Sequence, residues 1–488
     1  MKTEGTENSK SASEMPDKIL GTGSQNVALK REVGLFSSVC LIAGIMIGSG
    51  IFMSPEWVLY YMGSPGASLL IWAAGGVLSM LGGLCYVELG TTIKESGGNY
   101  IYLLRNFGPL PAFLYMYTTL ILTGPSKTAA NALSFAKYVA APFYEGCAPP
   151  QVVVKCVAAI CILVVTAINC FNVKLATGTQ NVFTAAKLLA LFLILVGGVV
   201  VLIRGQTMNL QNAFQDTAVG FGPVGLAFYQ ALWAYDGWNM LNNVTEEVKR
   251  PQKTLPRAIL IAIPVVTFLY VMVNVSYFAV MTTNEFLKSN APAVTWGSKI
   301  LGTWMWLIPV SVAMSTFGTI NGTTFAAGRV WHVAAREGHL PDIFSMVHVQ
   351  RLTPFPPLII KAFLALCMII PGDFVSIVNY CSFMTWLVIG VSTAGLLKIK
   401  IIEPKHPTSY KVPIIVPVIL LIASVYLVLA PIIDKPQIEY LYAVLCILSG
   451  IFLYFPLIHF KCHPKFLSKI TLHLQLFLQV IPTAKNID

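Results

Sequence analysis

The stretch Ile47-Gly48-Ser49-Gly50-Ile51-Phe52 decides how this chain folds. It lies inside an apolar run over residues 35–61 that is long enough to cross a lipid bilayer. Two glycines around a serine are unfavourable there, because each glycine costs roughly 1 kcal/mol relative to alanine in a helix. Lipid offers no partner to a freed backbone group, so the break must line a cavity or pack against protein. Such a break presents N–H groups at one half-helix end and carbonyls at the other, which together bind small charged groups.

The composition of the whole chain is that of a polytopic membrane protein. Of its 488 residues, 56% are hydrophobic and 11% are charged, with a mean hydropathy of +0.71. A soluble domain would be about a quarter charged. Residues 1–33 are polar and of mixed sign, which predicts a cytoplasmic tail and no cleavable signal peptide. The transporter domain is expected over 34–460 and a cytoplasmic tail over 461–488.

Hydropathy predicts twelve membrane spans of about 20 residues each. They are expected near 35–61, 67–90, 109–135, 151–171, 180–203, 221–243, 257–282, 304–330, 356–371, 374–397, 412–433 and 438–459. With this map, 23 of the 32 Lys and Arg residues fall in cytoplasmic segments and 6 in outer segments. The asymmetry predicts that both termini are cytoplasmic. It also accounts for the net charge of +11 without a nucleic-acid partner.

A second interruption is predicted at Ala234-Tyr235-Asp236-Gly237-Trp238, five spans after the first. Interrupted helices at equivalent places in two five-helix halves indicate an inverted repeat. Spans 1–5 and 6–10 would form the halves, and the last two spans would be accessory. The fold class is therefore an all-α membrane protein with broken helices 1 and 6.

Charged residues within spans are the most informative, because their burial is expensive. Lys187 either snorkels to the inner face or projects into the bundle beside the first break. In the second case its positive charge would stand where a sodium ion could otherwise sit, making transport independent of sodium. The Asp236 carboxylate could bind a substrate ammonium or a basic side chain of the substrate. Alternatively, its charge could be neutralised within the protein. Lys127 is the possible neutraliser, and a pair of the two would favour neutral substrates.

Several polar and aromatic residues near these charges are further candidates. Trp233 and Tyr235 flank the second break, where an aromatic ring either packs or acts as a gate. Ser126 precedes Lys127 and is a candidate for selectivity. Asn321 could line the site, or could join helices through a hydrogen bond.

Cys147 is distinct among the ten cysteines. It lies in the predicted outer loop between spans 3 and 4, an oxidising setting, without an intramolecular partner on that side. This predicts a bridge to another chain. Most other cysteines lie in apolar spans as small hydrophobic residues.

Clusters of polar residues follow three of the spans on the cytoplasmic side. They cover 94–98, 246–251 and 336–339, and are either solvated loops or an inner gate of ion pairs. In 461–488, apolar residues at helical spacing predict a helix on the membrane surface or docked on the transporter. The sequence contains no metal-binding spacing, P-loop or GxSxG motif, so no enzyme, metal or cofactor is predicted.

Together these features resemble the light subunits of the heterodimeric amino acid transporters, in the amino acid–polyamine–organocation superfamily. The specific motifs are Ile47–Phe52, Glu88–Thr91 with Ser96–Gly98, Phe183–Lys187, Trp233–Trp238 with Thr245–Glu247, and Cys147. The branch with the greatest resemblance is the b(0,+) type, which exchanges cystine and cationic amino acids for neutral ones.

The resemblance implies a LeuT-like fold and sodium-independent obligatory exchange of amino acids at the plasma membrane, on the apical side in epithelia. It implies that Ile47, Gly48, Ser49 and Gly50 hold the substrate carboxylate. Carbonyls of the second break, around Trp233, Ala234, Tyr235 and Asp236, would hold the amino group. Trp233 would close over the substrate, and Asp236 would recognise a cationic side chain. Cys147 would form the disulfide to a type II membrane glycoprotein heavy subunit.

The chain also departs from the b(0,+) pattern. Gly124-Pro125-Ser126-Lys127 replaces Lys-Pro-Thr-Ser, and Val480-Ile481-Pro482-Thr483 replaces a segment with two consecutive prolines. These changes are typical of a diverged branch that prefers aromatic substrates, and Lys127 argues against cationic selectivity. A channel, or a partner that only stabilises a heavy subunit, is the alternative from another class.

Overall fold

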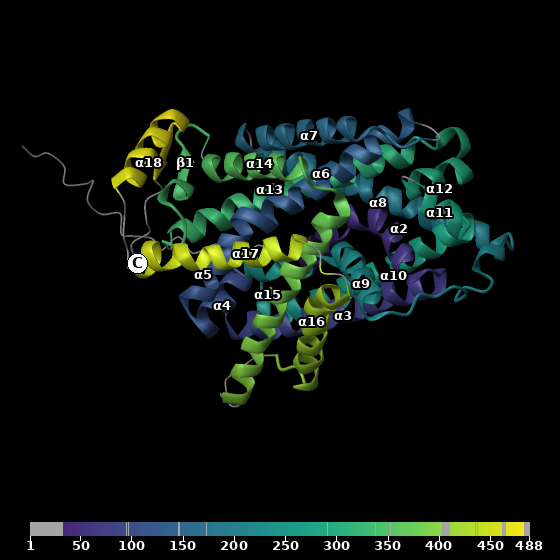
Figure 1. Ribbon diagram of the computed structural model, residues 1–488, viewed down its shortest axis with the longest axis horizontal. Coiled ribbons are helices and arrows are strands. Elements are labelled where there is room, and N and C mark those ends of the chain that lie inside the picture. Colours follow the sequence, from purple (N-terminus) through teal and green to yellow (C-terminus); the bar gives the residue numbers. More distant parts are fainter. Residues whose placement is uncertain are drawn as a thin grey trace, which may run out of the picture.

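Most of the described residues are helical in the computed structural model (Figure 1). The structure describes residues 33–482, apart from 94, 96, 145–146, 172, 290, 337, 352, 403–409, 435, 437 and 461–464. The predicted N-terminal tail therefore lies outside the described residues, except for Val33. The all-helical character of the transporter domain is as the sequence predicts.

The described helices follow the predicted spans closely. The first part of the chain forms α1 (Leu35–Met46), α2 (Gly50–Met62), α3 (Pro65–Thr92), α4 (Asn99–Phe107), α5 (Pro109–Thr118), α6 (Gly124–Ala140), α7 (Gln151–Phe171) and α8 (Val173–Ile203). The second part forms α9 (Phe221–Tyr235), α10 (Pro251–Val280), α11 (Thr283–Lys288), α12 (Pro292–Ile300), α13 (Leu307–Arg336), α14 (Phe355–Ile369), α15 (Phe374–Ile402), α16 (Ile415–Asp434), α17 (Ile438–Tyr454) and α18 (Lys465–Leu478). Two short strands, β1 (Met346–His348) and β2 (Val480–Pro482), complete the fold.

Seven of the described helices are long and apolar enough to cross a membrane, and the α1–α2 pair would be an eighth span. The other predicted spans are shorter or interrupted. A π-helix over Thr119–Thr123 separates α5 from α6, and α9 stops at Tyr235. A 3₁₀-helix over Met240–Glu247 replaces the second α-helical half expected in the span over 221–243. The prediction of twelve spans therefore stays a prediction.

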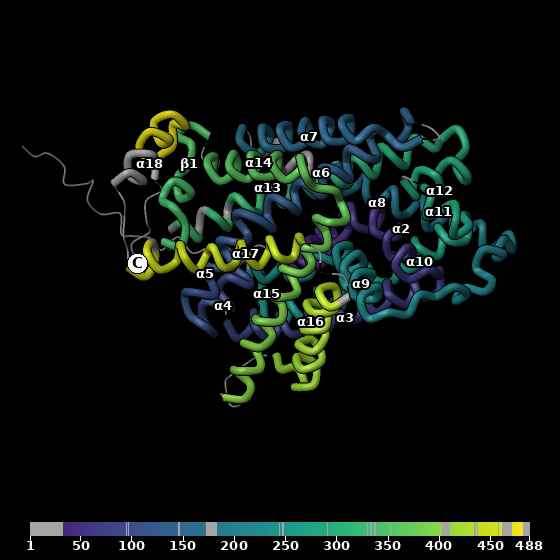
Figure 2. Tube along the Cα trace, in the orientation of Figure 1, coloured from purple at the N-terminus to yellow at the C-terminus, as the bar shows by residue number. Residues whose placement is uncertain are grey.

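Helices α7, α13, α14 and α17 run along the long axis of the molecule, whereas α15 and α16 cross it steeply (Figure 1). The small helices α11 and α12 lie at one end, and α18 and β1 lie at the other. Near the centre, α2 and α9 lie side by side although they are far apart in the sequence (Figure 2). This contact joins the two helix interruptions.

Small residues let these helices approach closely, as is usual between membrane helices. A Cβ atom at Gly76 of α3 would lie 2.3 Å from the Thr267 hydroxyl oxygen of α10, and one at Gly83 would lie 2.8 Å from Ile259. These contacts hold α3 against α10. Of these two helices, α3 also packs against α9.

A second, smaller hydrophobic cluster lies at the end of the bundle that carries the C-terminus. There β2 pairs antiparallel with β1, with Val347 opposite Ile481. Val480 is buried in this cluster beside residues of α4, α13 and the segment after α13. The C-terminal segment is thus docked on the transporter, one of the two arrangements that the sequence predicts.

Candidate functional site

The first interruption lies between α1 and α2, at the stretch that the sequence singles out. α1 ends at Met46, α2 begins at Gly50, and the two helices are bent by 49°. The Ser49 side chain makes no capping hydrogen bond to the first turn of α2. The first N–H groups of a helix have no intrahelical partner and form its positive end. They are therefore suited to hold an anionic group.

The second interruption follows the last turn of α9. Asp236 adopts an extended conformation that ends the helix, and Gly237 has a φ of +118°, which favours glycine. A Cβ atom at Gly237 would lie 2.6 Å from Cγ2 of Ile45, in α1. No further turn of α9 follows to donate hydrogen bonds to its last carbonyls. These carbonyls therefore form the negative end of the helix.

The two interruptions are held together at close range. A Cβ atom at Gly50 would lie 2.4 Å from Cα of Ala234, so only glycine lets α2 and α9 approach this closely. The Tyr270 hydroxyl of α10 lies 2.7 Å from the Met46 carbonyl oxygen and 3.0 Å from that of Ala234. Its proton can be donated to either carbonyl, which ties the end of α1 to the end of α9.

Lys187 projects into the bundle beside the first interruption and does not snorkel to the inner face. Its side chain is buried, and Nζ donates hydrogen bonds to the carbonyl oxygens of Gly44 at 2.5 Å and Ile47 at 3.0 Å. These carbonyls belong to the negative end of α1. The ammonium therefore occupies a place where a bound cation would otherwise be stabilised.

A chain of hydrogen bonds links the first interruption to α6. The Ser49 hydroxyl donates to Oδ1 of Asn131 at 2.6 Å, and Nδ2 of Asn131 donates to the Lys127 carbonyl oxygen at 2.7 Å. The buried Asn131 thus fixes the Ser49 rotamer. Sequence reasoning missed both Asn131 and Tyr270. The sequence hardly marks these two residues, because a neutral polar side chain in an apolar span usually serves helix packing.

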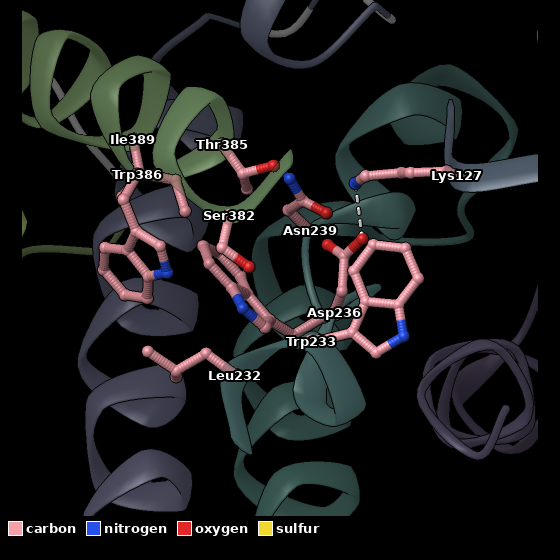
Figure 3. A pocket seen from close by; sticks show the side chains of 10 residues that line it. Lys127, Leu232, Trp233, Asp236, Asn239, Ser382, Thr385, Trp386 and Ile389 are labelled. Atoms are coloured by element: carbon pink, nitrogen blue, oxygen red, sulfur yellow. Dashed lines mark hydrogen bonds and ion pairs between the residues drawn. The ribbon is translucent and has the colours of Figure 1, made fainter. Parts of the chain in front are cut away.

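The structure brings Lys127 and Asp236 together. Lys127 Nζ lies 2.5 Å from Asp236 Oδ2, and the two side chains are 30% and 35% exposed (Figure 3). The pair lines a pocket between α6, α9 and α15, with Trp233, Asn239 and Thr385 beside it. The cavity volume is about 20 Å³, enough for little more than one water molecule. The Asp236 charge is therefore balanced inside the pocket.

The remaining predicted site residues occupy different places. Trp233 packs edge-on against Phe374 of α15, with ring centroids 6.3 Å apart. Ser126 is buried and accepts a hydrogen bond from the Tyr380 hydroxyl at 2.7 Å. Asn321 accepts a hydrogen bond from Asn169 of α7 at 2.8 Å. Asn321 thus joins helices and does not line the pocket around the Lys127–Asp236 pair.

Ion pairs also occur near the cytoplasmic ends predicted for α3 and α15. Glu88 is buried, pairs with Lys400 at 2.6 Å and accepts a hydrogen bond from the Val412 backbone N–H. Glu95 and Arg105 form an exposed bidentate pair. The side chains of Glu246 and Glu247, two members of the predicted inner gate, lie outside the described residues.

Cys147 is exposed in the segment between α6 and α7. Within the part of the chain that the structure describes, it is not in a disulfide. The thiol is therefore accessible, and the predicted bridge to another chain stays a prediction.

Comparison with known proteins relates this chain to one large family. The amino acid permease family matches residues 33–453. The human b(0,+)-type amino acid transporter 1 is 48% identical over 464 residues, covering 95% of this chain and 95% of that protein. The human large neutral amino acids transporter small subunit 2 is 42% identical, covering 93% and 86%. The cystine/glutamate transporter of Pongo abelii is 41% identical, covering 94% and 92%.

Proposed function

Because this chain belongs to the amino acid permease family, we propose that its two helix interruptions bind the carboxylate and the ammonium of an amino acid. The N–H groups at Gly48–Gly50 would hold the carboxylate, which every substrate shares. The carbonyls of the last turn of α9 would hold the ammonium. The contact between these interruptions is the observation that carries the proposal, because it places a donor end beside an acceptor end.

The protein is an amino acid exchanger of the plasma membrane that works without sodium. Support comes from Lys187, whose ammonium binds two backbone carbonyls that could otherwise coordinate a sodium ion. A second cation at this place would meet direct charge repulsion. Alternating access would move the substrate past two five-helix halves arranged as an inverted repeat in a twelve-helix, LeuT-like fold.

The preferred substrates are amino acids without net side-chain charge, namely large neutral and aromatic amino acids and cystine. The argument rests on the Lys127–Asp236 pair, because a balanced carboxylate attracts a basic side chain only weakly. Trp233 would close over the bound substrate, and its contact with Phe374 joins α9 to α15 at this gate.

The partner is a type II membrane glycoprotein heavy subunit bound through Cys147. Both termini would then be cytoplasmic, as the distribution of Lys and Arg predicts. In epithelia we expect the complex at the apical membrane. Exposure of Cys147 in the segment before α7 is compatible with this linkage.

A second candidate function is b(0,+)-like exchange of cystine and cationic amino acids for neutral ones. The 48% identity to the human b(0,+)-type amino acid transporter 1 favours it. In that case a basic substrate would have to displace Lys127 from Asp236.

The test is uptake of tyrosine, arginine and cystine into liposomes that contain the chain with its heavy subunit. We expect tyrosine uptake to require an internal amino acid and to be equal in sodium and in choline buffer. Uptake without internal amino acid would contradict exchange and indicate a channel. A sodium requirement would contradict the role of Lys187, and faster uptake of arginine than of tyrosine would favour the second candidate.

A further inference from the structure

A large apolar cavity lies between α6, α8 and α13, separate from the pocket around Asp236. Its volume is about 490 Å³, far more than the pocket offers. Ala313 and Met314 of α13 line one side, and Val139 of α6 lines the other. Tyr138 is the lining residue with a hydroxyl group, and it donates this hydroxyl to the Phe52 carbonyl at 2.7 Å. The cavity therefore offers a ligand apolar contacts only.

The mouth of the cavity lies at the ends of α6 and α13. Phe143, in the turn after α6, is 80% exposed, and Trp306, just before α13, is 49% exposed. Trp304 and Trp306 lie side by side there, with ring centroids 6.3 Å apart. Tryptophans at helix ends mark the level of the lipid head groups. The cavity thus begins near the head groups and continues along α13 into the hydrocarbon region.

Three phenylalanines form the inner wall of the cavity. Phe317 of α13 contacts Phe183 of α8 and Phe135 of α6, with ring centroids 5.1 and 6.0 Å away. Phe183 lies one helical turn before Lys187, and Phe135 lies one turn after Asn131. The rings that close the cavity are therefore carried by the same helices that position the first interruption.

Physical chemistry restricts the occupant of such a space. Water finds almost no polar partner along this lining, so an apolar space that opens onto the hydrocarbon region is filled by hydrocarbon. Leaving it empty would forfeit dispersion contacts along its whole lining. A lipid chain enters from hydrocarbon and loses no hydration, whereas a partner helix of about 10–12 Å diameter would lie across the mouth. The mouth also opens beside a helix apolar enough to span the membrane, Gly302–Gly328.

We propose that this cavity binds one acyl chain of a phospholipid from the adjacent leaflet, which is the outer leaflet in the predicted topology. The head group lies near Phe143 and Trp306, and the chain packs along Val310, Ala313 and Met314. Its end reaches the phenylalanine wall. Because this wall supports the helices of Lys187 and Asn131, the bound chain becomes part of the packing behind the transport site.

The experiment uses the full-length chain with its heavy subunit in phosphatidylcholine liposomes. A fraction of the phosphatidylcholine carries a photoreactive diazirine in the middle of one acyl chain. After illumination, mass spectrometry locates the labelled residues. We expect labelling of the segments that contain Val310–Phe317 and Phe135–Val139. It should exceed the labelling of ordinary lipid-facing residues, such as Leu260 and Phe268 of α10, which are 48% and 62% exposed.

A filled cavity provides the matched comparison. Ala313→Phe places a ring in the cavity, and we expect it to reduce labelling of both segments severalfold. Ala423→Phe, at a half-buried position of α16 away from the cavity, should leave labelling unchanged. If Ala313→Phe does not fold, Val310→Trp blocks the cavity from a position that is 47% exposed.

Two outcomes would overturn the proposal. Labelling of the cavity segments at the same level as α10, with no effect of either blocking variant, would show that no chain occupies the space. Labelling absent from the whole face around Val310 would show that protein covers the mouth. Neither outcome depends on transport, so the result is independent of the proposed exchange activity.

Discussion

Two lysines at the proposed transport site differ in the partner of their ammonium group. Lys187 donates hydrogen bonds to two backbone carbonyls, whereas Lys127 forms an ion pair with Asp236. In the proposed function, the first lysine substitutes for a sodium ion. The second would neutralise the carboxylate that could otherwise attract a basic substrate. Each role can be tested by removing one ammonium.

Removal of the Lys127 ammonium should change substrate selectivity. In Lys127→Ser, Asp236 keeps its charge without a partner, so we expect faster arginine uptake relative to tyrosine. The gain should be about tenfold, since a hydrogen bond between charged groups is worth roughly 1.5–3 kcal/mol and 1.4 kcal/mol is a factor of ten. The measurement is competitive uptake of the two amino acids in liposomes. The double variant with Asp236→Asn should lose the gain, and an unchanged ratio in Lys127→Ser would refute the neutralisation.

Removal of the Lys187 ammonium should impair exchange itself. Lys187→Met leaves the Gly44 and Ile47 carbonyls without their donor, and an unsatisfied buried group costs about 1–3 kcal/mol. We expect the exchange rate to fall by roughly tenfold or more in sodium and in choline alike. Lys155→Met is the control, because Lys155 also donates to a backbone carbonyl, that of Ile370, but at an exposed place. Equal rates in Lys187→Met and wild type would contradict the assignment.

At the scale of helices, the site depends on how closely α2 and α9 approach. Gly50→Ala would place a methyl group 2.4 Å from Cα of Ala234, so the two helices must separate. Such overpacking costs typically about 1–3 kcal/mol and should also abolish most exchange. Gly44→Ala, with open space around the new methyl group, should be neutral or stabilising by up to about 1 kcal/mol. Thermal unfolding of both variants, together with exchange rates, distinguishes these outcomes.

The two ion pairs near α3 differ in burial, and their contributions to stability should differ accordingly. The Glu88 side chain is 3% exposed in its pair with Lys400, whereas that of Glu95 is 46% exposed in its pair with Arg105. Removing one partner of a buried pair costs about 3–5 kcal/mol, but an exposed pair contributes at most about 1 kcal/mol. Glu88→Ala should therefore lower the midpoint of thermal unfolding much more than Glu95→Ala. Equal shifts would mean that the Glu88–Lys400 pair is solvated.

Much of this arrangement could be predicted from the sequence, and the limits have physical causes. The breaks at Gly48–Gly50 and Asp236–Gly237 could be predicted because glycine and charge are costly in a membrane helix. Asn131 and Tyr270 could not, because a neutral polar tip in an apolar span is common and only the fold shows its partner. The 3₁₀-helix over Met240–Glu247 that follows the predicted break could not be predicted either, because hydropathy does not distinguish helix types. Hydropathy continues to residue 243, whereas the helix stops where its backbone turns at Gly237.

At the scale of the whole molecule, the two ends of the bundle have different construction. The end with α11 and α12 carries the aromatic mouth of the apolar cavity, and the other end is closed by the C-terminal segment. There Val480 of β2 is packed with residues of α4 and α13 in the second hydrophobic cluster. β2 therefore joins α4 and α13, two helices that hydropathy alone does not relate to the C-terminal segment.

The packing of β2 can be tested with two neighbouring residues of this strand, one as the variant and the other as its control. Val480 is 2% exposed and Ile481 is 44% exposed, because successive side chains of a strand point to opposite faces. Val480→Asp would bury an unpaired carboxylate, which should cost several kcal/mol and lower both the unfolding midpoint and the amount of folded protein. Ile481→Asp keeps the same charge on the exposed face and should behave like wild type within about 0.5 kcal/mol. If both variants unfold at the wild-type temperature, β2 does not hold α4 and α13 together, and the docked C-terminal segment contributes nothing to stability.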